Sequence, residues 1–328
     1  MVNLETSVFN HHIMKIVIIG GTGHTGSYLV PMLVTAGHEV TVVTRQERKP
    51  YMDHTAWKTV KYLAIDRQEA DRKKTFGKQI RKLSPDIVID MICFTPESAK
   101  LLVESLAGEI QHFLHCGTIW VHGYSEQVPT TEMQARKPFG DYGIKKAAIE
   151  EWLLAYSRKT GFPATILHPG HIVGPGWIPL NPAGHFNPQV YKDISIGREL
   201  VLPNLGMETV HHVHAGDLAQ AFFRAIYSHS TATGESFHVV SPGALTLRGY
   251  AEAMYAWAGK EPKLKFLPWE KWKKNVSEKD AAATWDHIAH SPNCSIEKAR
   301  KLLGYEPRYT SLQAVQESVK YLFDNKLI

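Results

Sequence analysis

A glycine-rich turn near the start of the chain constrains the fold most. The β-branched run of residues 15–19 ends in Gly-Gly-Thr-Gly-His-Thr-Gly, and apolar residues at helical spacing follow. Gly20, Gly23 and Gly26 thus form a GxxGxxG pattern between a strand and a helix. Glycines there permit a tight turn and close approach of a pyrophosphate, and the helix N-terminus attracts phosphate. A turn without a ligand is the alternative, but this position in a strand-turn-helix unit favours dinucleotide binding.

Strand-like runs alternate with helical stretches through the first half of the chain. Alternating strands and helices favour parallel pairing with crossover helices. We therefore predict an α/β fold, a Rossmann-type doubly wound parallel sheet with a smaller C-terminal substrate-binding region. After the first strand, β-rich runs are predicted at residues 40–43, 60–65, 87–92, 113–116 and 164–167.

The chain divides into three parts. Residues 1–13 lack the basic and apolar regions of a signal peptide, so we expect a loose N-terminal extension. Residues 14–174 carry the strand and helix pattern of an NAD(P)-binding Rossmann domain. Residues 175–328 are expected to bind substrate, with a segment at about 208–240 returning to the Rossmann domain. The loop at 175–188, rich in Pro, Gly, Asn and His, is typical of a binding loop.

Composition limits the environment and the partners of the protein. The 328 residues are 44% hydrophobic and 21% charged, which is typical of a globular enzyme. The formal net charge of +5 is spread without a basic block, and no apolar run reaches membrane-spanning length, so we expect neither nucleic acid nor membrane as a partner. Cys93, Cys116 and Cys294 are widely spaced, which disfavours a disulfide framework or a zinc ribbon. We expect a cytoplasmic protein that acts on a small molecule, with a homodimer as the candidate assembly.

The residues after the second and third strands bear on which dinucleotide binds. An NAD-binding protein usually has an acidic residue after the second strand, whereas this chain has Thr44 and Arg45. Arg45 can pair with a 2′-phosphate, so NADP is favoured over NAD, although an exposed arginine without a ligand is the alternative. Asp66 can accept a hydrogen bond from the adenine amino group, or it can cap a helix.

Tyr142 and Lys146 are a candidate acid/base pair. At positions i and i+4 they share one face of a predicted helix. A phenol with a pKa of about 10 is a poor acid or base at neutral pH, and a nearby ammonium group lowers that pKa. Taken alone, this spacing is also common on amphipathic helices, so other residues must support the assignment.

A hydroxyl residue and further short motifs accompany that pair. Thr118 follows the fifth strand and precedes Val-His-Gly at 121–123, and Pro-Gly at 169–170 and Val-Gly-Pro at 173–175 follow the sixth. With the glycine pattern and Tyr-Gly-x-x-Lys, these residues resemble the extended short-chain dehydrogenase/reductase family, also called the NAD-dependent epimerase/dehydratase family. The resemblance extends from Met14 to the last predicted helix.

The resemblance implies particular site residues. It places Thr118, Tyr142 and Lys146 in a catalytic triad for hydride transfer, in which Tyr142 moves the proton and Lys146 lowers the pKa of Tyr142 and holds the nicotinamide ribose. Residues of the glycine turn and the strand ends would contact the cofactor. That set is Gly20, Gly23, His24, Thr25, Gly26, Arg45, Asp66, Met91, Lys146 and Pro169.

The chain also departs from the family pattern. Members that act on nucleotide diphosphate sugars often carry Arg where this chain has Val210 and Asn where it has His171. A valine cannot pair with phosphate, so a nucleotide sugar loses its expected anchors. The family's usual Arg is also replaced at His168, and Asp90 on the fourth strand has no assigned partner.

Histidine and aromatic residues gather on the predicted substrate side. A zinc site is conceivable, but strand alternation separates His211 from His212 and His214, so we predict no metal. Hydrogen bonding to substrate is favoured for one or two histidines, with core packing as the alternative for every candidate. The substrate candidates are Trp120, His171, Trp177, Asn181 and His185.

Together these features predict an NAD(P)-dependent oxidoreductase or epimerase that acts on a small polar substrate, carbohydrate-like or hydroxy-carbonyl. A nucleotide-sugar epimerase or dehydratase with an altered diphosphate site is the main alternative. A non-catalytic dinucleotide-sensing or RNA-associated relative is less favoured, because all three triad residues are present.

Overall fold

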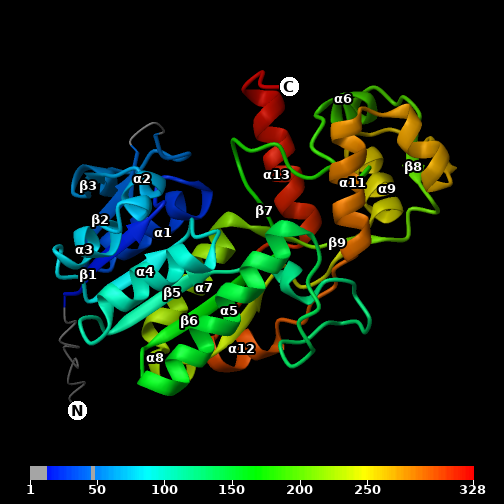
Figure 1. The fold of residues 1–328 in the computed structure, drawn as a ribbon. Helices are drawn as coiled ribbons and strands as arrows, with labels where there is room; N and C mark the ends of the chain where they lie inside the picture. The colour runs from blue at the N-terminus through cyan, green and yellow to red at the C-terminus, as the bar shows by residue number, and fades with distance from the viewer. Residues whose placement is uncertain (1–12, 46–48) are drawn as a thin grey trace, which may run out of the picture.

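The computed structural model describes residues 13–45 and 49–328 (Figure 1). The expected N-terminal extension therefore lies outside the described residues, apart from Ile13. Within the described part of the chain, no helix is both long enough and apolar enough to cross a membrane.

A parallel sheet of seven strands forms the centre of the larger lobe, in the order β11-β6-β5-β4-β1-β2-β3. The order changes direction between β1 and β4, which opens a crevice at the carboxyl ends of the strands. This topology confirms the predicted doubly wound sheet. The strands are β1 (Lys15–Ile19), β2 (Glu39–Thr44), β3 (Lys61–Ala64), β4 (Ile87–Asp90), β5 (His112–Cys116), β6 (Ala164–Pro169) and β11 (Ser236–Val239).

Helices cover both faces of this sheet (Figure 1). Ile16 and Ile18 of β1 face the buried cluster that includes α1 and α7, while Val17 and Ile19 face the cluster of α3, α4 and α5. Burial on both faces is why the central strands are continuously apolar rather than alternating. The helices are α1 (His24–Thr35), α7 (Ala215–Tyr227), α3 (Phe76–Arg81), α4 (Pro96–Leu106) and α5 (Gly140–Thr160).

A second lobe surrounds its own apolar core beside the carboxyl ends of the strands (Figure 1). Three small two-stranded sheets contribute to it: β7 (His171–Val173) with β10 (His212–His214), β8 (Leu200–Pro203) with β13 (Leu264–Leu267), and β9 (Thr209–Val210) with β12 (Leu245–Thr246). Its core is surrounded by α6 (Gln189–Ser195), α9 (Leu247–Trp257), α10 (Trp269–Trp272), α11 (Glu278–His290) and α13 (Ser311–Asp324). The remaining helices α2 (Arg67–Arg72), α8 (His229–Ala232) and α12 (Glu297–Leu303) pack with the larger lobe.

Many histidines are buried in both lobes and are held neutral. Burial lowers the pKa of His112 and His212 from 6.5 to about 3, and that of His211 and His287 to about 4. An unfolded histidine titrates near 6.5, so below that pH only the unfolded chain takes up these protons. The stability that these groups confer is therefore complete above pH 6.5 and is lost as the pH falls.

We predict acid unfolding close to pH 5. Each of the four histidines would lower the free energy of unfolding by about 2 kcal/mol between pH 7 and 5, and the sum of about 8 kcal/mol rivals the usual 5–15 kcal/mol of a folded domain. Urea titrations across this range should show the free energy of unfolding falling steeply. Equal values at pH 7 and pH 5.5 would contradict the buried, neutral state of these side chains.

Candidate active site

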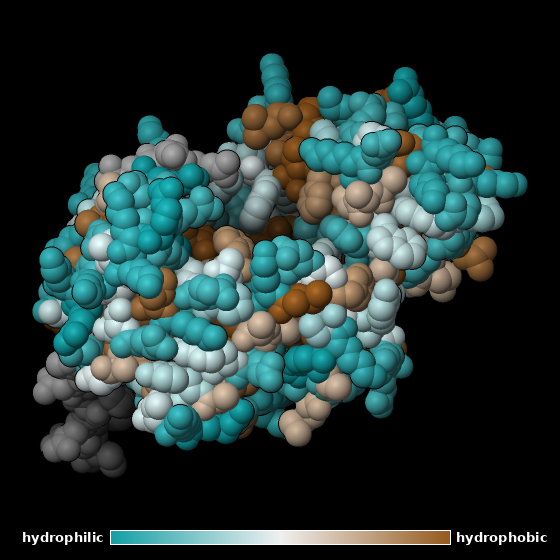
Figure 2. Space-filling model, viewed as in Figure 1, coloured by the Kyte–Doolittle hydropathy of each residue, from teal (hydrophilic) through white to brown (hydrophobic). Residues whose placement is uncertain are grey.

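Two adjoining cavities lie at the carboxyl ends of the strands, where the strand order reverses. The larger one, about 660 Å³, is enclosed by the glycine turn, the ends of β5 and β6, and side chains of the second lobe. The smaller one, about 440 Å³, lies over the ends of β2 and β3. Both reach Gly20, Gly23, Ile92 and Phe94. Figure 2 shows hydrophobic residues in the hollow between the lobes.

The glycine turn is shaped for close approach of a ligand. Gly20 has a φ of +85°, and a Cβ at Gly26 would lie 2.1 Å from the carbonyl oxygen of Gly21, so neither position accepts a side chain. A Cβ at Gly23 would meet only the Gly20 oxygen at 3.4 Å, which leaves space above the start of α1. Gly23 is the N-cap of α1, and no side chain accepts a hydrogen bond from the first turn of this helix. The backbone N–H groups of that turn therefore face the cavity without a side-chain acceptor. These features fit a dinucleotide pyrophosphate.

His24 stands beside this turn with both ring nitrogens unsatisfied among the described residues. Its ring packs edge-on against Tyr51 and Trp177, with centroid distances of 4.0 and 3.7 Å. Burial lowers its pKa to about 3, so the imidazole is neutral. A buried ring with open hydrogen-bonding atoms also fits a polar ligand at this place.

The smaller cavity contains the residues expected on the adenosine side. Thr44, Arg45 and Asp66 line it, together with Thr22, whose hydroxyl oxygen lies 3.4 Å from that of Thr44. Asp66 Oδ1 also accepts a hydrogen bond of 2.9 Å from the backbone N–H of Glu69 as the N-cap of α2. The helix-capping alternative for Asp66 is therefore realised, and its contact with adenine stays a prediction.

Asp90 has a partner that the sequence did not indicate. Its two carboxylate oxygens accept hydrogen bonds of 2.6 and 2.9 Å from the guanidinium of Arg67, the first residue of α2. Oδ1 also accepts from the backbone N–H of Ile92 at 3.3 Å. The pair is buried and orders the chain after β4, so Asp90 supports the cavity wall rather than presenting a free charge.

The structure brings Thr118, Tyr142 and Lys146 together on one wall of the larger cavity. Thr118 follows β5, and its hydroxyl lies close enough to the Tyr142 phenol to lower the pKa of that phenol. Lys146 lies one turn beyond Tyr142 on α5, with Nζ 6.0 Å from the centroid of the Tyr142 ring. Lys146 is only 2% exposed, and its ammonium donates to the carbonyl oxygen of Cys116 at 2.6 Å.

The electrostatics of the pair differ from the sequence expectation. Desolvation by the surrounding cavity wall raises the pKa of Tyr142 to about 12, and the Thr118 hydroxyl opposes that rise, although the residue is 42% exposed. Burial also lowers the pKa of Lys146. In this structure the Lys146 ammonium donates to the Cys116 carbonyl at the end of β5, and its expected lowering of the Tyr142 pKa stays a prediction. Tyr142 is therefore a protonated phenol at neutral pH, which is the form that donates a proton to a carbonyl.

Three of the five expected substrate residues line the larger cavity: Trp120, His171 and Trp177. Asn181 and His185 line neither cavity and are bonded to each other, with 3.0 Å between Asn181 Nδ2 and His185 Nδ1. Asn181 Oδ1 also accepts from the backbone N–H of Ala183 at 2.9 Å. Both side chains thus satisfy the backbone of a buried loop, which corrects the expectation that they face the substrate.

His287 is a cavity residue that the sequence reasoning missed. It lies on α11, where Nδ1 donates to the carbonyl oxygen of Ala283 at 2.6 Å, which leaves Nε2 as an acceptor. Its ring centroid is 5.4 Å from that of His171 and 5.2 Å from that of Trp120. Burial keeps both imidazoles neutral by lowering the pKa of each. Because α11 shows only an ordinary amphipathic pattern, no sequence signal marked this residue.

The rest of the larger cavity is mainly apolar. Its further walls include Phe94, Ile178, Leu180, Phe186 and Val210. Among the described residues that line it, Lys146 is the only lysine or arginine. Over residues 13–45 and 49–328, no group of three or more His, Cys, Asp or Glu side chains is arranged to hold a metal ion.

A doubly wound sheet with a glycine turn and a polar triad at its crevice defines a Rossmann-type dinucleotide-binding protein. The chain belongs to the NAD dependent epimerase/dehydratase family, whose model matches residues 16–239. The expected family and the expected enzyme class, the extended short-chain dehydrogenase/reductase type, are thereby confirmed.

Relatives in this family carry several different names. Chloroplast stem-loop binding protein of 41 kDa b from Arabidopsis thaliana is 25% identical over 93% of this chain and 78% of its own length. The 2'-dehydrokanamycin reductase of Streptomyces kanamyceticus is 24% identical over 74% of this chain and 66% of its own. UDP-glucose 4-epimerase from Corynebacterium glutamicum is 23% identical over 93% and 94%.

Solved structures share the fold. UDP-glucose 4-epimerase from Thermotoga maritima, solved with UDP-glucose, has a TM-score of 0.71 at 19% identity and covers 96% of this chain and 100% of that one. The dTDP-glucose 4,6-dehydratase of Bacillus anthracis, solved with NAD, has a TM-score of 0.73 at 17% identity and covers 96% and 98%.

Proposed function

We propose that this protein is an NAD(P)-dependent oxidoreductase or epimerase that moves a hydride to or from a small, uncharged hydroxy-carbonyl or carbohydrate-like substrate. The observation that carries the proposal is the joint position of Thr118, Tyr142 and Lys146 on one cavity wall beside the glycine turn. A dinucleotide laid across Gly20 to Gly26 brings its nicotinamide end toward that wall. When bound, the cofactor supplies or accepts the hydride.

Each triad residue has a distinct task in the reductive direction. The protonated phenol of Tyr142 donates its proton to the substrate carbonyl oxygen, and Thr118 Oγ1 orients that oxygen through a hydrogen bond. Lys146 holds the nicotinamide ribose, and its positive charge favours the phenolate that remains on Tyr142 after transfer. In the oxidative direction the same groups act in reverse. An epimerase completes both directions on one substrate with its cofactor retained, whereas a reductase exchanges the cofactor.

The walls of the larger cavity support an uncharged substrate. Neutral imidazoles at His171 and His287 can exchange hydrogen bonds with a hydroxyl or carbonyl group, and they offer no positive charge to an anion. Trp120 and Phe186 provide flat apolar faces for a ring or a carbon chain. A polar but uncharged molecule matches both kinds of wall.

Two alternatives rest on named relatives. The relatives named UDP-glucose 4-epimerase favour a nucleotide sugar, which would need a diphosphate site different from theirs. The stem-loop binding relative favours an RNA-associated role, but that role does not require the assembled Thr118–Tyr142–Lys146 wall. Mass spectrometry of small molecules released from the purified protein separates these cases, because retained cofactor indicates epimerisation and a bound substrate identifies the chemistry.

We extend the proposal to location and assembly. The cysteines are free in the structure, with Cys93 and Cys294 buried, which suits a reducing cytoplasm. A homodimer stays the candidate assembly. Neither nucleic acid nor membrane is proposed as a partner.

The first functional prediction concerns Tyr142→Phe. The variant keeps the ring but loses the phenolic proton, so hydride transfer should fall by about 10² to 10⁴, the usual contribution of a general acid or base. Cofactor affinity, measured by fluorescence titration, should change little. Tyr62→Phe, on β3, is the matched control and should turn over like the parent. Turnover of Tyr142→Phe within a few-fold of the parent would exclude the acid/base role.

The second concerns the cofactor. Arg45 is exposed at the rim of the smaller cavity and can pair with a 2′-phosphate, so NADPH should bind more tightly than NADH. Arg45→Ala should remove roughly 1.5 to 3 kcal/mol of that preference, the contribution of a charge-assisted hydrogen bond. Arg72→Ala, at the end of α2, serves as the control for a nearby exposed charge. Calorimetric titration with both nucleotides is the measurement, and tighter NADH binding by the parent would overturn the preference.

The third concerns nucleotide sugars. A diphosphate in the larger cavity would meet Val210 and neutral His171 instead of arginine and asparagine, and it would remain unpaired at a cost of several kcal/mol. Lys192 and Arg198, the nearest cationic side chains beyond the loop at 175–188, are not among the residues that line the cavity. Calorimetry with UDP and UDP-glucose in the presence of cofactor should therefore show dissociation constants of about millimolar or weaker. A micromolar constant for either would favour the nucleotide-sugar alternative.

A further inference from the structure

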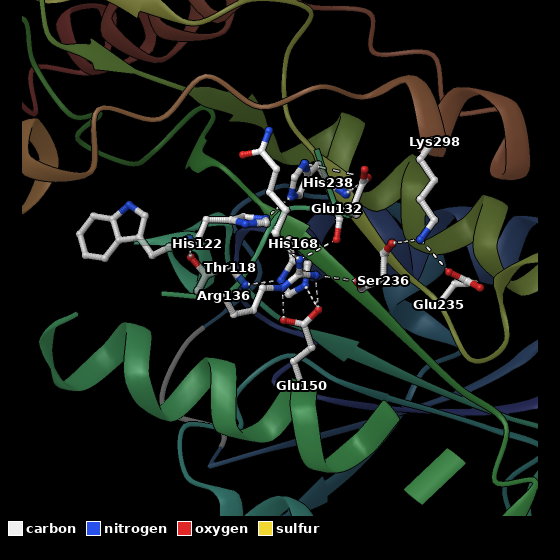
Figure 3. Close-up of polar contacts among 12 residues, drawn as sticks. Thr118, His122, Glu132, Arg136, Glu150, His168, Glu235, Ser236, His238 and Lys298 are labelled. Carbon is white, nitrogen blue, oxygen red and sulfur yellow. Dashed lines mark hydrogen bonds and ion pairs between the residues drawn. The ribbon is translucent and has the colours of Figure 1, made fainter. Parts of the chain in front are cut away.

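A chain of polar side chains, buried at His168 and Glu150 and partly exposed at Arg136, leads away from Thr118. It runs through His168 on β6 to Glu150 on α5, and from there to Arg136 in the segment before α5 (Figure 3). His168 is 0% exposed and Glu150 is 3% exposed. These groups belong neither to the triad nor to the lining of the two cavities.

His168 holds the backbone that carries the catalytic hydroxyl. Its Nδ1 accepts a hydrogen bond of 3.0 Å from the backbone N–H of Thr118. The contact is close because residue 117 is glycine: a Cβ there would lie 2.3 Å from the same Nδ1. Since Nδ1 accepts, the ring proton is on Nε2, and that atom lies 3.1 Å from Oε1 of Glu150. The contact lies outside hydrogen-bond geometry, and the nearby negative charge of the carboxylate favours the tautomer that can bind Thr118.

Arg136 fixes Glu150 in turn. Its guanidinium donates to both carboxylate oxygens, at 2.7 and 3.2 Å, and also to the Ser236 hydroxyl at 3.2 Å and the Glu132 carbonyl at 2.6 Å. Burial alone would raise the pKa of Glu150, but His168 and Arg136 beside it hold that pKa well below its usual range. Glu150 is therefore a carboxylate at neutral pH that is held in place by two hydrogen bonds from Arg136.

The spacing on α5 connects this chain to the triad. Tyr142, Lys146 and Glu150 follow one another at intervals of four residues, so they lie along one side of the helix. Tyr142 meets the side chain of Thr118, while Glu150 controls the backbone of Thr118 through His168. Helix α5 thus positions Tyr142 directly and positions Thr118 through Glu150 and His168.

We propose that His168, oriented by Glu150 and Arg136, is a positioning residue that sets the Thr118 hydroxyl against the Tyr142 phenol. The inference rests on the proposed function, because Thr118 and Tyr142 are the reacting groups there. A shift of a few tenths of an ångström in the Thr118 backbone changes the position of its hydroxyl relative to the Tyr142 phenol. Catalysis depends strongly on the relative position of such groups.

Other titratable groups border His168 without bonding to Thr118. His238 of β11 has its ring centroid 6.2 Å away, and its Nε2 lies 2.8 Å from Nε2 of His122. Glu132 accepts from the backbone N–H of His238 at 2.8 Å, and His115 lies on the neighbouring strand β5. These groups surround the row of polar side chains from Thr118 to Arg136 and have no role at the triad.

The test uses two variants that differ only in which ring nitrogen they imitate. His168→Asn places an amide near Nδ1 and can still accept from Thr118, whereas His168→Gln extends to the position of Nε2 and cannot. The readout is the ¹³C resonance of the Tyr142 ring carbon that bears the hydroxyl, in the full chain labelled at tyrosine. Tyr142→Phe assigns the resonance, and Thr118→Val gives its position when the Thr118 hydroxyl is lost.

We expect His168→Asn to keep the parent position and His168→Gln to move the resonance toward that of Thr118→Val. His112→Gln is the matched control: His112 is equally buried, at the other end of β5, and its Nε2 lies 2.8 Å from the Thr165 hydroxyl. This control should leave Tyr142 unchanged. An unshifted resonance in His168→Gln, or the same shift in both His168 variants, would overturn the proposal.

Turnover provides the second readout. His168→Gln should lower kcat about tenfold and leave the Kd of NADPH unchanged, while His168→Asn should stay close to the parent. A kcat for His168→Gln equal to that of His168→Asn contradicts positioning. The ¹³C resonance needs no substrate, so its result stands apart from the proposed function, which fails instead when Tyr142→Phe retains turnover.

Discussion

The packing of helix α5 against the carboxyl ends of β5 and β6 is the constraint on which the site depends. The helix has 21 residues and projects three polar side chains toward the sheet at regular intervals. Lys146 is bound to the end of β5 through the Cys116 carbonyl, and Glu150 reaches His168 of β6. Displacing this helix would break the contact of Tyr142 with Thr118 as well as both of these attachments.

Aromatic packing joins the second lobe to the same helix. The His290 ring of α11 lies between Trp120 and Phe139, with centroid distances of 4.1 and 4.0 Å and nearly parallel planes. Phe139 is the N-cap of α5, and Trp120 lines the cavity next to Tyr142. Helix α11, which carries His287, therefore packs through His290 against the start of α5, which carries Tyr142, the proposed acid. Substrate and catalytic walls keep a fixed relation through these rings.

The cofactor side is organised by a different interaction. Arg67 and Asp90 form a buried bidentate pair between α2 and the end of β4, with Arg67 Nε also 3.0 Å from the Ser98 hydroxyl. Removing either partner would leave a buried charge without compensation. The pair fixes the chain at Met91, which lines the larger cavity, and at Ile92, which lines both cavities. The Asp90 carboxylate on a central strand thus shapes the nucleotide crevice, although it lines neither cavity.

The sequence by itself determined the sheet and the glycine turn, because each depends on local spacing, whereas Thr118, Tyr142 and Lys146 were selected by a family resemblance and their catalytic roles stay a prediction. Runs of β-branched residues, glycines at fixed intervals and a tyrosine four residues before a lysine are readable without knowing the remainder of the chain. Only the tertiary structure decided three further features. These are the partner of Asp90, the hydrogen bonding of Asn181 and His185 within their own loop, and the position of His287 at the cavity. Those outcomes depend on contacts between residues far apart in sequence. They also depend on which polar groups become buried and therefore need a hydrogen-bond partner within the protein.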